Sequence, residues 1–379
     1  MENSCDAIVI GAGPAGLAAA AALKARGRDT VILEKSGVVG SVWRRHYDRL
    51  HLHTDRARSG LPGLPMPKAY GRYPSRVQVV EYLENYAAKF DLKPVFNVAV
   101  GAIRRDRAAW RAEAGRHSWR APNVVIATGW ADFPHSPVWP GIETFAGPVQ
   151  HSSVYRNPTP FAGKRVLVIG YGNSGAEIAL DLAETGIDVT LSVRSPVNIV
   201  PRELFGLPIL VFPIAEQWLP PRAADILNAL PIRFAVGSLA TAGLTKAAKG
   251  PLRTIAEDGR PPLIDVGTLA QIRAGRIKVR GDVAHFTVDG VAFAHSPTER
   301  FDAAIIATGF RPDLHPLLPD AKGVLTASGA PLVSGRETAE LGLFFCGALV
   351  SPIGQLRQIA IEAVAIADAI VRAPEARDA

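Results

Sequence analysis

The stretch VLVIGYGNSGAEIALDL, residues 166–182, is the clearest indication of how this chain folds. An apolar, β-branched run leads into a turn with three glycines, and a helix pattern follows the turn. The stretch AIVIGAGPAGLAAAAAL, residues 7–23, has the same strand–turn–helix form near the start of the chain. A further strand pattern follows each helix, at residues 30–33 and 188–194, so each stretch opens a βαβ unit. The sequence therefore predicts an α/β fold with two Rossmann-like dinucleotide-binding domains.

The two turns share the spacing G-x-G-x-x-G, in which each glycine has its own task. The first permits the tight turn, the second lets the backbone approach a pyrophosphate, and the third lets helix and strand pack closely. The phosphates would lie at the helix N-terminus, where N–H groups and the helix dipole favour anions. In chain order the positions are Gly11, Gly13 and Gly16 in the first turn and Gly170, Gly172 and Gly175 in the second.

The end of the second strand in each βαβ unit indicates which nucleotide binds. Glu34 follows the strand at 30–33, and a carboxylate there would accept hydrogen bonds from ribose hydroxyls and repel a 2′-phosphate. The strand at 188–194 ends in Arg194 without an acid, and a guanidinium matches a phosphate in charge and geometry. We therefore expect FAD in the first domain and NADPH in the second. The alternative for Arg194 is a solvated arginine at a strand end.

The order of the elements predicts that the NADPH domain is inserted into the FAD domain. We expect the FAD domain at residues 1–155 and 299–379, and the NADPH domain at 156–298. Within the NADPH domain, residues 196–262 form an apolar, proline-rich helical insertion.

Other elements are predicted from local patterns. Ser75 is a good N-cap for a helix that runs to about Phe90. Strands are expected near residues 95–103 and 123–127, and a final helix from about 354 to 373.

Two segments have similar sequences, VVIATGW at residues 124–130 and AIIATGF at 304–310. Each is an apolar strand that ends in Ala-Thr-Gly, and a glycine there lets the chain leave the sheet beside a bound nucleotide. GLFFCGALV, residues 342–350, is a third strand that ends at a glycine. The helix that begins around Gly354-Gln355 would direct its N-terminus at the flavin, or would serve only for packing.

Composition excludes several classes of protein. The net charge is +7 over 379 residues and the basic residues are scattered, so nucleic acid is not an expected partner. Cys5 and Cys346 have neither metal-ligand nor redox-pair spacing, so no metal site is expected. No apolar run is long enough to span a membrane, and Met1 is followed by no signal peptide, so we expect a cytoplasmic protein. Oligomeric state stays open, with a homodimer as one candidate.

One apolar stretch, LFGLPILVFPIAEQWLP at residues 204–220, is interrupted by two prolines. Interrupted apolar stretches are more often internal, so we favour a packed hairpin or pocket wall. A patch that contacts a membrane surface is the alternative.

The linker between the two βαβ units carries a further motif. Phe145, Gly147, His151 and Tyr155 fit the pattern FxGxxxHxxxY, so the chain resembles the class B flavin-containing monooxygenases. It is most similar to the YUCCA subgroup, through YDRLHLHT, YPSRVQVVEYLENYAAKFDL, HSSVYRNPTPFAGKRVLVIGYGNSGAEIALDLA and PLIDVGTLAQIRAGRIKV, in the order of that subgroup. The chain departs from related flavoproteins at Cys346-Gly347-Ala348, where a Gly-Asp pair is common.

The resemblance implies an enzyme that uses a small-molecule substrate, O2, FAD and NADPH. NADPH would reduce FAD, O2 would add at C4a to give a (hydro)peroxyflavin, and that species would oxygenate the substrate. The first substrate class is a 2-oxo acid such as indole-3-pyruvate, giving indole-3-acetate as in auxin biosynthesis. S- or N-oxygenation of a small soft nucleophile is the second, and a non-catalytic, redox-responsive flavoprotein is the alternative of another class. No catalytic side chain is assigned, because the flavin carries the chemistry.

The glycine turns and the resemblance together indicate the site residues. Candidates that line the flavin are Trp43, His53 and Thr54; His51 and His53 would face one side of a strand. His151 and Tyr155 are expected to position the linker and NADP+ rather than transfer protons. The FAD contacts are Gly11, Gly13, Pro14, Ala15, Gly16, Glu34, Lys35, Trp43, Val98, Ala127, Thr128, Gly129, Gly347 and Gln355. The NADPH contacts are Ser152, Tyr155, Gly170, Tyr171, Gly172, Asn173, Ser174, Gly175, Arg194, Ser195, Ala307, Thr308 and Gly309.

Overall fold

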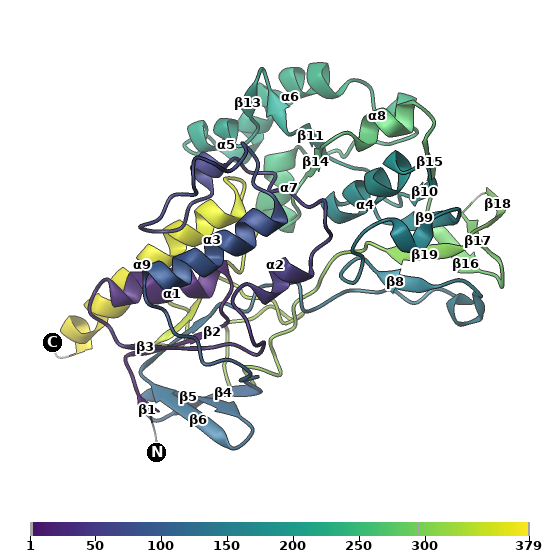
Figure 1. The fold of residues 1–379 in the computed structure, drawn as a ribbon. Coiled ribbons are helices and arrows are strands. Elements are labelled where there is room, and N and C mark those ends of the chain that lie inside the picture. The colour runs from purple at the N-terminus through teal and green to yellow at the C-terminus, as the bar shows by residue number, and fades with distance from the viewer. Residues whose placement is uncertain (1–2, 295, 378–379) are drawn as a thin grey trace. The chain divides into compact units, whose positions relative to one another are not determined.

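The protein, in a computed structural model, is described for residues 3–294 and 296–377 and divides into two compact units (Figure 1). Unit 1 contains the residues up to Arg44, Thr54–Phe133 and the residues from Arg311 onward. Unit 2 contains Arg45–His53 and Pro134–Phe310. The chain therefore passes from one unit to the other four times. The boundaries between the units lie after residues 44, 53, 133 and 310, whereas the sequence predicted domain ends after residues 155 and 298.

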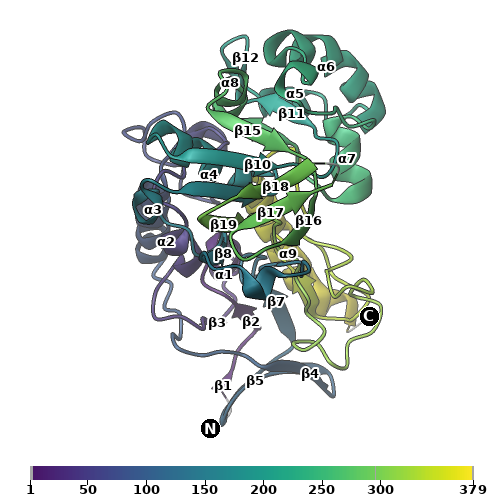
Figure 2. The same ribbon diagram turned by 90° about the vertical axis from the view of Figure 1, so that its right-hand side faces the viewer.

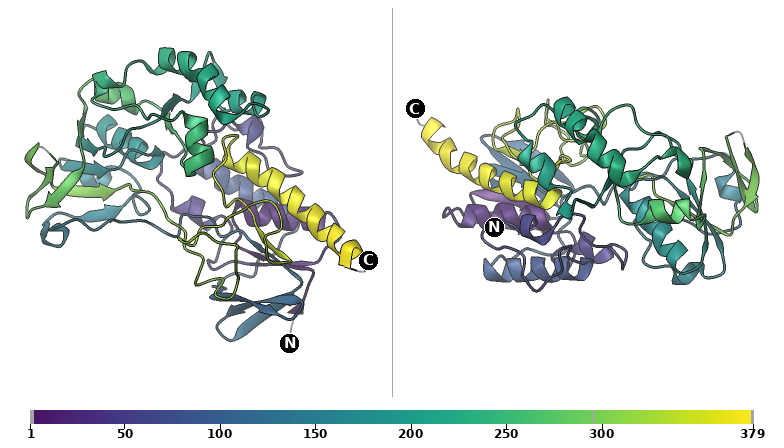
Figure 3. Two further views of the ribbon diagram at one scale, coloured as in Figure 1. Left: turned by 180° about the vertical axis from the view of Figure 1, so that it is seen from behind. Right: turned by 90° about the horizontal axis from the view of Figure 1, so that it is seen from above.

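Unit 1 is built on a parallel sheet in the order β20-β7-β2-β3. Its strands are buried apolar runs, as expected for a parallel sheet covered on both faces. Helix α1 is rich in alanine, and it packs along the C-terminal helix α9, beside which it lies in Figure 3. The bounds are β2 Ala7–Ile10, α1 Pro14–Lys24, β3 Thr30–Leu33, β7 Asn123–Ile126, β20 Leu343–Phe345 and α9 Gln355–Arg377.

The meander β4–β5–β6 packs on the other face of this sheet. Ile8 and Ile126 from the sheet share one apolar cluster with Trp110 and Trp119 from the meander. The short strand β1 pairs with β6 in parallel. The bounds are β1 Asn3–Ser4, β4 Ala102–Asp106, β5 Ala109–Ala114 and β6 His117–Ala121.

The predicted strand at 95–103 is wrong in most of its length. Only a single bridge joins Val95 to Leu33, and β4 begins at Ala102. Pro94 lacks an N–H for a ladder, and Asn97 has a φ of +60°, in the left-handed region, which interrupts an extended strand.

Helix α3, Arg76–Lys89, confirms the predicted cap and length. The Ser75 hydroxyl accepts from the Gln78 amide, and the Gln78 side chain accepts from the Ser75 amide, which forms a capping box. Tyr82 and Tyr86 lie on its buried face and bond to the backbone of residues 61–64. The helix thereby fixes the irregular segment before it, which holds α2, Ser41–Arg45, and the short helix η1, Arg56–Arg58.

Unit 2 is built on a second parallel sheet, in the order β15-β10-β9-β19-β8. Alternate residues of β9 face opposite ways: Val166 and Val168 join the cluster under α4, and Leu167 and Ile169 join the cluster of the β16–β17–β18 sheet. The bounds are β8 Val149–His151, β9 Arg165–Ile169, α4 Asn173–Glu184, β10 Asp188–Ser192, α8 Thr268–Arg273, β15 Ile277–Arg280, β16 Val283–Phe286, β17 Gly290–Phe293, β18 Ser296–Arg300 and β19 Ala303–Ile306.

The compact units end where they do because of strands β8 and β19. Both strands pair within the sheet of unit 2, β8 with β19 and β19 with β9. Residues 134–155 and 299–310 therefore fold with this sheet, although the sequence analysis grouped them with the FAD domain. The linker also carries the short helices η2, Ile142–Thr144, and η3, Thr159–Phe161.

The insertion at 196–262 forms a helical subregion at one edge of unit 2 (Figure 2). The expected hairpin is confirmed, with Leu204, Ile209 and Leu210 buried, but Phe205 and Trp218 are exposed. The pair β11–β14 ties the insertion together. The bounds are β11 Ile199–Pro201, β12 Glu203–Leu204, β13 Leu207–Pro208, α5 Val211–Ala215, α6 Pro221–Val236, η4 Ala240–Ala242, α7 Pro251–Asp258 and β14 Leu263–Asp265.

Candidate functional site

The first glycine turn joins β2 to α1 and leaves no room for side chains at two of its three glycines. Gly11 has a φ of +106°, and a Cβ there would lie 2.7 Å from the carbonyl oxygen of Ala127. A Cβ on Gly16 would collide with the carbonyl of Gly11. At Gly13, by contrast, a Cβ would meet nothing within 4 Å. The turn is therefore closed toward the protein and open at the position that a pyrophosphate would approach.

Glu34 is buried at the end of β3, beside this turn. Its two carboxylate oxygens accept from the backbone N–H of Ala12, at 2.7 Å, and of Ser36, at 2.9 Å. A carboxylate offers about four acceptor sites, so two remain for ribose hydroxyls. The backbone N–H of Val98 donates to the Glu34 carbonyl, which places this predicted contact next to the acid.

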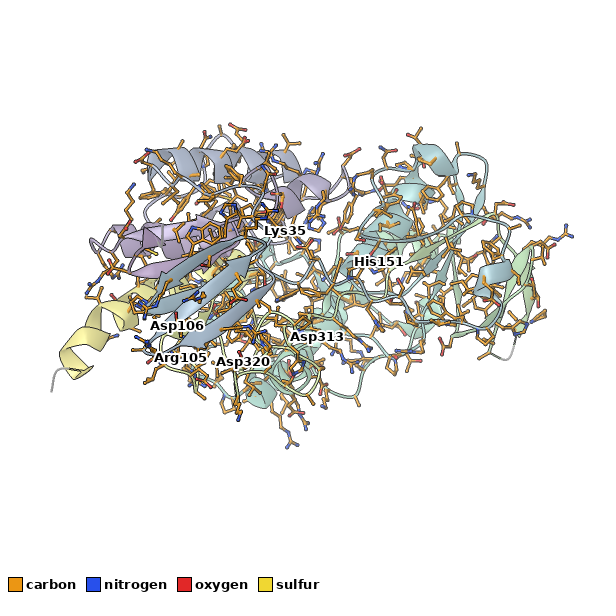
Figure 4. All side chains as sticks on the ribbon, turned by 90° about the horizontal axis from the view of Figure 1, so that it is seen from below. Lys35, Arg105, Asp106, His151, Asp313 and Asp320 are labelled. Atoms are coloured by element: carbon orange, nitrogen blue, oxygen red, sulfur yellow. The ribbon has the colours of Figure 1, made fainter. Side chains whose placement is uncertain are left out.

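Other residues predicted to contact FAD surround the same turn. Pro14 occupies the first turn of α1, where its missing N–H costs no hydrogen bond. Lys35, which is labelled in Figure 4, forms an ion pair with Asp132 at 2.8 Å within unit 1. Thr128 and Gly129 line a small pocket, together with Trp130, Cys346 and Ala348. Trp43 lies on α2, in unit 1.

The turn after β20 is held by a buried acid that the sequence analysis missed. Glu362, on α9, accepts from the Gly347 N–H and the Ser334 hydroxyl, both at 2.7 Å. The Gln355 side chain donates to the Gly347 carbonyl at 3.1 Å. A Cβ on Gly347 would lie 3.3 Å from Ala15, so this turn packs against the start of α1.

The second glycine turn repeats the geometry of the first. Gly170 has a φ of +109°, and a Cβ there would lie 2.5 Å from the carbonyl oxygen of Ala307. A Cβ on Gly175 would collide with the Gly170 carbonyl, and a Cβ on Gly172 would again meet nothing within 4 Å. Each Ala-Thr-Gly segment thus supports the first glycine of the turn in its own unit.

Three polar side chains of the second turn differ in their surroundings. The Asn173 amide bonds to the backbone of Ile264 and Pro262, so it holds the insertion rather than facing open space. Ser174 is half-buried at the start of α4. The hydroxyl of Tyr171 is buried without a hydrogen-bond partner, and burial raises its pKa. An unpartnered buried hydroxyl is uncommon, and it leaves a donor available to a bound ligand.

Arg194 and Ser195 are exposed just beyond the end of β10. Within residues 3–294 and 296–377, the Arg194 guanidinium makes no ion pair or hydrogen bond. The last residue of β10, Ser192, is buried and donates to the Gly281 carbonyl at 2.8 Å. The strand end therefore presents a free cation and no carboxylate, which suits a 2′-phosphate.

His151, which is labelled in Figure 4, bonds to the second Ala-Thr-Gly segment. Its Nδ1 accepts from the Ser153 N–H at 3.1 Å, and its Nε2 lies 3.1 Å from the Gly309 carbonyl, to which it donates. Burial lowers the pKa of His151, which favours this neutral form. The Ser152 N–H donates to the Ile306 carbonyl, and the Thr308 hydroxyl donates to the His135 carbonyl. These bonds support the expected positioning role.

Residues 45–53, which we call the strap, lie against helix α4 of unit 2. His53 Nε2 is 2.6 Å from the buried carboxylate of Glu177. Tyr47 also bonds to Glu177, and burial raises its pKa well above the usual value. Arg49 pairs with Asp181 at 3.4 Å and with Glu184 at 2.7 Å, the three acids lying on one face of α4.

The positions of four predicted site residues, in the strap and near it, differ from those expected. His51 and His53 do not share a strand face: His51 is exposed, and His53 turns toward α4. His53 belongs to unit 2, whereas Thr54 belongs to unit 1 and bonds to Ser59. Tyr155 is 1% exposed and donates to Asp181 at 2.7 Å, which favours support of α4 over direct contact with NADPH. Burial raises the pKa of both Tyr155 and Asp181.

The described residues fit two dinucleotides. Each unit offers an open second glycine at a helix N-terminus, and only unit 1 has an acid at the adjoining strand end. Cys5 and Cys346 are free thiols, and burial raises the pKa of Cys346 well above its usual value. Over the part of the chain that the structure describes, no cluster of three His, Cys, Asp or Glu could hold a metal. No helix there is long and apolar enough to cross a membrane.

The open second glycines give a matched pair of variants. We expect Gly172→Ala to weaken NADP+ binding by about tenfold or more, because its methyl group occupies the space of the pyrophosphate. FAD content should be unchanged, since Gly172 lies in unit 2. Gly13→Ala should do the reverse and lower FAD retention. Titration with NADP+ and flavin absorbance after gel filtration measure both, and unchanged NADP+ affinity in Gly172→Ala would contradict the assignment.

The contribution of the strap to stability is tested by replacing its histidines one at a time. His53→Ala leaves the buried Glu177 carboxylate short of a partner, so the free energy of unfolding should fall by about 1–3 kcal/mol. The control is His51→Ala, which removes an exposed ring and should change stability by less than about 0.5 kcal/mol. Urea unfolding of both variants is the measurement, and equal losses would show that the strap does not depend on His53.

Comparison with known proteins places this geometry in a family. A family model described as pyridine nucleotide-disulphide oxidoreductase matches residues 8–201. The indole-3-pyruvate monooxygenase YUCCA1 of rice, Oryza sativa subsp. japonica, is 42% identical over 328 residues, 85% of this chain and 81% of the relative.

Solved structures agree with this result. A double mutant of a flavin monooxygenase from Stenotrophomonas maltophilia is 28% identical, with a TM-score of 0.73 and full coverage of both chains. An oxidised steroid monooxygenase bound to NADP has a TM-score of 0.76 at 20% identity, over 99% of this chain and 86% of that chain, and shows the shared fold alone. The chain therefore belongs to the YUCCA family of flavin-dependent monooxygenases, oxidoreductases that use FAD and NADPH.

Proposed function

We propose that this enzyme oxidatively decarboxylates a 2-oxo acid, with indole-3-pyruvate as the first candidate. The balanced reaction is 2-oxo acid, NADPH, H+ and O2 to the shortened acid, CO2, NADP+ and water. The observation that carries the proposal is the 42% identity to a rice indole-3-pyruvate monooxygenase over 85% of this chain. The two complete glycine turns support it, because the reaction needs both a flavin and NADPH.

We also propose that unit 1 holds FAD and unit 2 holds NADPH. In unit 1, Gly13 and the N-terminus of α1 would bind the pyrophosphate, and Glu34 would accept from the ribose. When bound, FAD supplies the redox chemistry by taking hydride from NADPH and reacting with O2. Trp43 and Gln355 remain candidates for positions near the flavin, and Lys35 acts through its pair with Asp132.

In unit 2, Gly172 and the N-terminus of α4 would bind the pyrophosphate of NADPH. Arg194 would pair with the 2′-phosphate, with Ser195 beside it, because no other group within the described chain engages the guanidinium. The Tyr171 hydroxyl is available to the same ligand. His151 keeps the Ala307–Gly309 turn in place beside Gly170 without transferring a proton.

Substrate class is tested by product analysis. The FAD-loaded enzyme, given NADPH, O2 and indole-3-pyruvate, should form indole-3-acetate and CO2 in step with NADPH oxidation. A thioether and a tertiary amine serve as parallel substrates. Sulfoxide or N-oxide without indole-3-acetate would favour S- or N-oxygenation, and NADPH oxidation that yields only H2O2 with every substrate would contradict a 2-oxo acid as substrate.

Coenzyme choice is tested at Arg194. Arg194→Ala should raise the KM for NADPH by about 10- to 100-fold, as expected for losing a charge-assisted hydrogen bond of about 1.5–3 kcal/mol. The KM for NADH should change by less than about threefold, because NADH has no 2′-phosphate. Arg300→Ala is the control, since Arg300 is an exposed arginine of unit 2 already paired with Asp289 at 2.9 Å. Equal effects on both coenzymes would remove Arg194 as the phosphate ligand.

A further inference from the structure

The insertion of unit 2 carries a group of large apolar side chains that the fold leaves in solvent. We call this group the apolar patch. Its members are 59–87% exposed, far more than core residues of the same types. They come from the hairpin tip, the segment before α6, and α6 itself: Phe205, Trp218, Ile226, Leu227, Leu230 and Phe234.

On α6 the exposed members follow helical spacing. Ile226, Leu227, Leu230 and Phe234 are at i, i+1, i+4 and i+8, so they form one stripe about 100° wide. The opposite face is the one that packs: Ala224 and Val236 are buried, and Ile232 joins the cluster under the hairpin. α6 therefore has two apolar faces, and the core of the insertion uses only one of them.

The position of Phe205 adds to this surface. Phe205 lies at the tip of the β12–β13 hairpin with a φ of +53°, a region that bulky side chains rarely adopt. The backbone there turns the ring outward, where it is 73% exposed. Strand β12 packs against α6, so the hairpin that carries Phe205 is a neighbour of this helix.

Two arginines lie beside the stripe on α6. The segment from β12 to α6 holds three acids. Asp225 accepts from the N–H groups of Leu252 and Arg253, Glu216 accepts from Asn228, and Glu203 lies half-buried on β12. Arg222 and Arg233 are exposed at one edge of the stripe, and neither side chain has an ion pair or hydrogen bond within the described residues. The two exposed charges at this edge of the α6 stripe are therefore both basic.

We propose that the apolar patch docks this enzyme onto the surface of a lipid bilayer that contains anionic headgroups. Aromatic and aliphatic side chains would enter the headgroup–acyl boundary, and Arg222 and Arg233 would pair with lipid phosphates. The helix has 16 residues and contains Pro231, shorter than the ~20 residues of a spanning helix, so it lies along the surface. A second copy fits less well, because its patch offers no carboxylate to Arg222 and Arg233.

Vesicle binding of the full-length, FAD-loaded protein tests this proposal. We expect co-sedimentation with vesicles of phosphatidylcholine and phosphatidylglycerol, stronger than with phosphatidylcholine alone and weakened by salt. Leu230→Asp combined with Phe234→Asp should reduce binding at least about tenfold, by loss of apolar burial. Arg222→Gln combined with Arg233→Gln should remove only the preference for the anionic vesicles.

The matched control is Val138→Asp, which alters an 88% exposed apolar residue of unit 2 outside the patch and should bind as wild type does. Retained FAD and an unchanged melting temperature show that each variant is folded. Absence of wild-type binding to both vesicle types would overturn the proposal. So would equal binding by Leu230→Asp/Phe234→Asp, or a concentration-dependent dimer that this variant abolishes in the absence of vesicle binding.

Discussion

Helix and strand approach so closely at each glycine turn that the first glycine's carbonyl occupies the place of a side chain on the third. This contact, between Gly11 and Gly16 in unit 1 and between Gly170 and Gly175 in unit 2, fixes where α1 and α4 begin. The carbonyls of Ala127 and Ala307 close the turns from the other side. At Gly13 and Gly172, by contrast, a Cβ would meet no atom within 4 Å. The cofactor sites proposed for the two units depend on this difference between the three glycines of each turn.

The remaining contacts keep these turns in place. Glu34 binds the N–H of Ala12 inside the first turn, and His151 binds the Gly309 carbonyl beside the second. Glu362 does the same for the turn at Gly347. Each is a polar side chain that bonds to the backbone of a loop. The protein therefore provides rigid, shaped binding surfaces and leaves the reaction to the cofactors.

The sequence predicted what depends on local spacing. The glycine turns, the Ala-Thr-Gly segments and the helix capped by Ser75 all follow from residues within about a dozen positions of each other. The strap was not predicted, because His53 and Glu177 are far apart in the chain and only the fold brings them together. A signal existed in α4: Glu177 and Asp181 interrupt an apolar helix at i, i+4, which indicates buried acids that need partners.

The strand predicted at residues 95–103 was wrong for a local reason. The apolar residues around Val98 alternate as in a strand, but Pro94 and Asn97 do not allow one. The first strand of the meander, β4, begins only at Ala102 and contains two arginines. The predicted domain ends differ from the ends of the compact units for a related reason. Whether β8 and β19 join the first or the second sheet is decided by pairing partners, which no local pattern contains.

The four passages of the chain between the units also order its synthesis. Unit 1 begins first at the ribosome but receives β20 and α9 last, after all of unit 2 has emerged. Until Leu343–Phe345 pairs with β7, that strand has an open edge, and α1 lacks the helix against which it packs. Unit 1 therefore stays incomplete while residues 134–310 of unit 2 are synthesised. A chain whose synthesis ended after residue 310 would contain all of unit 2 but only part of unit 1.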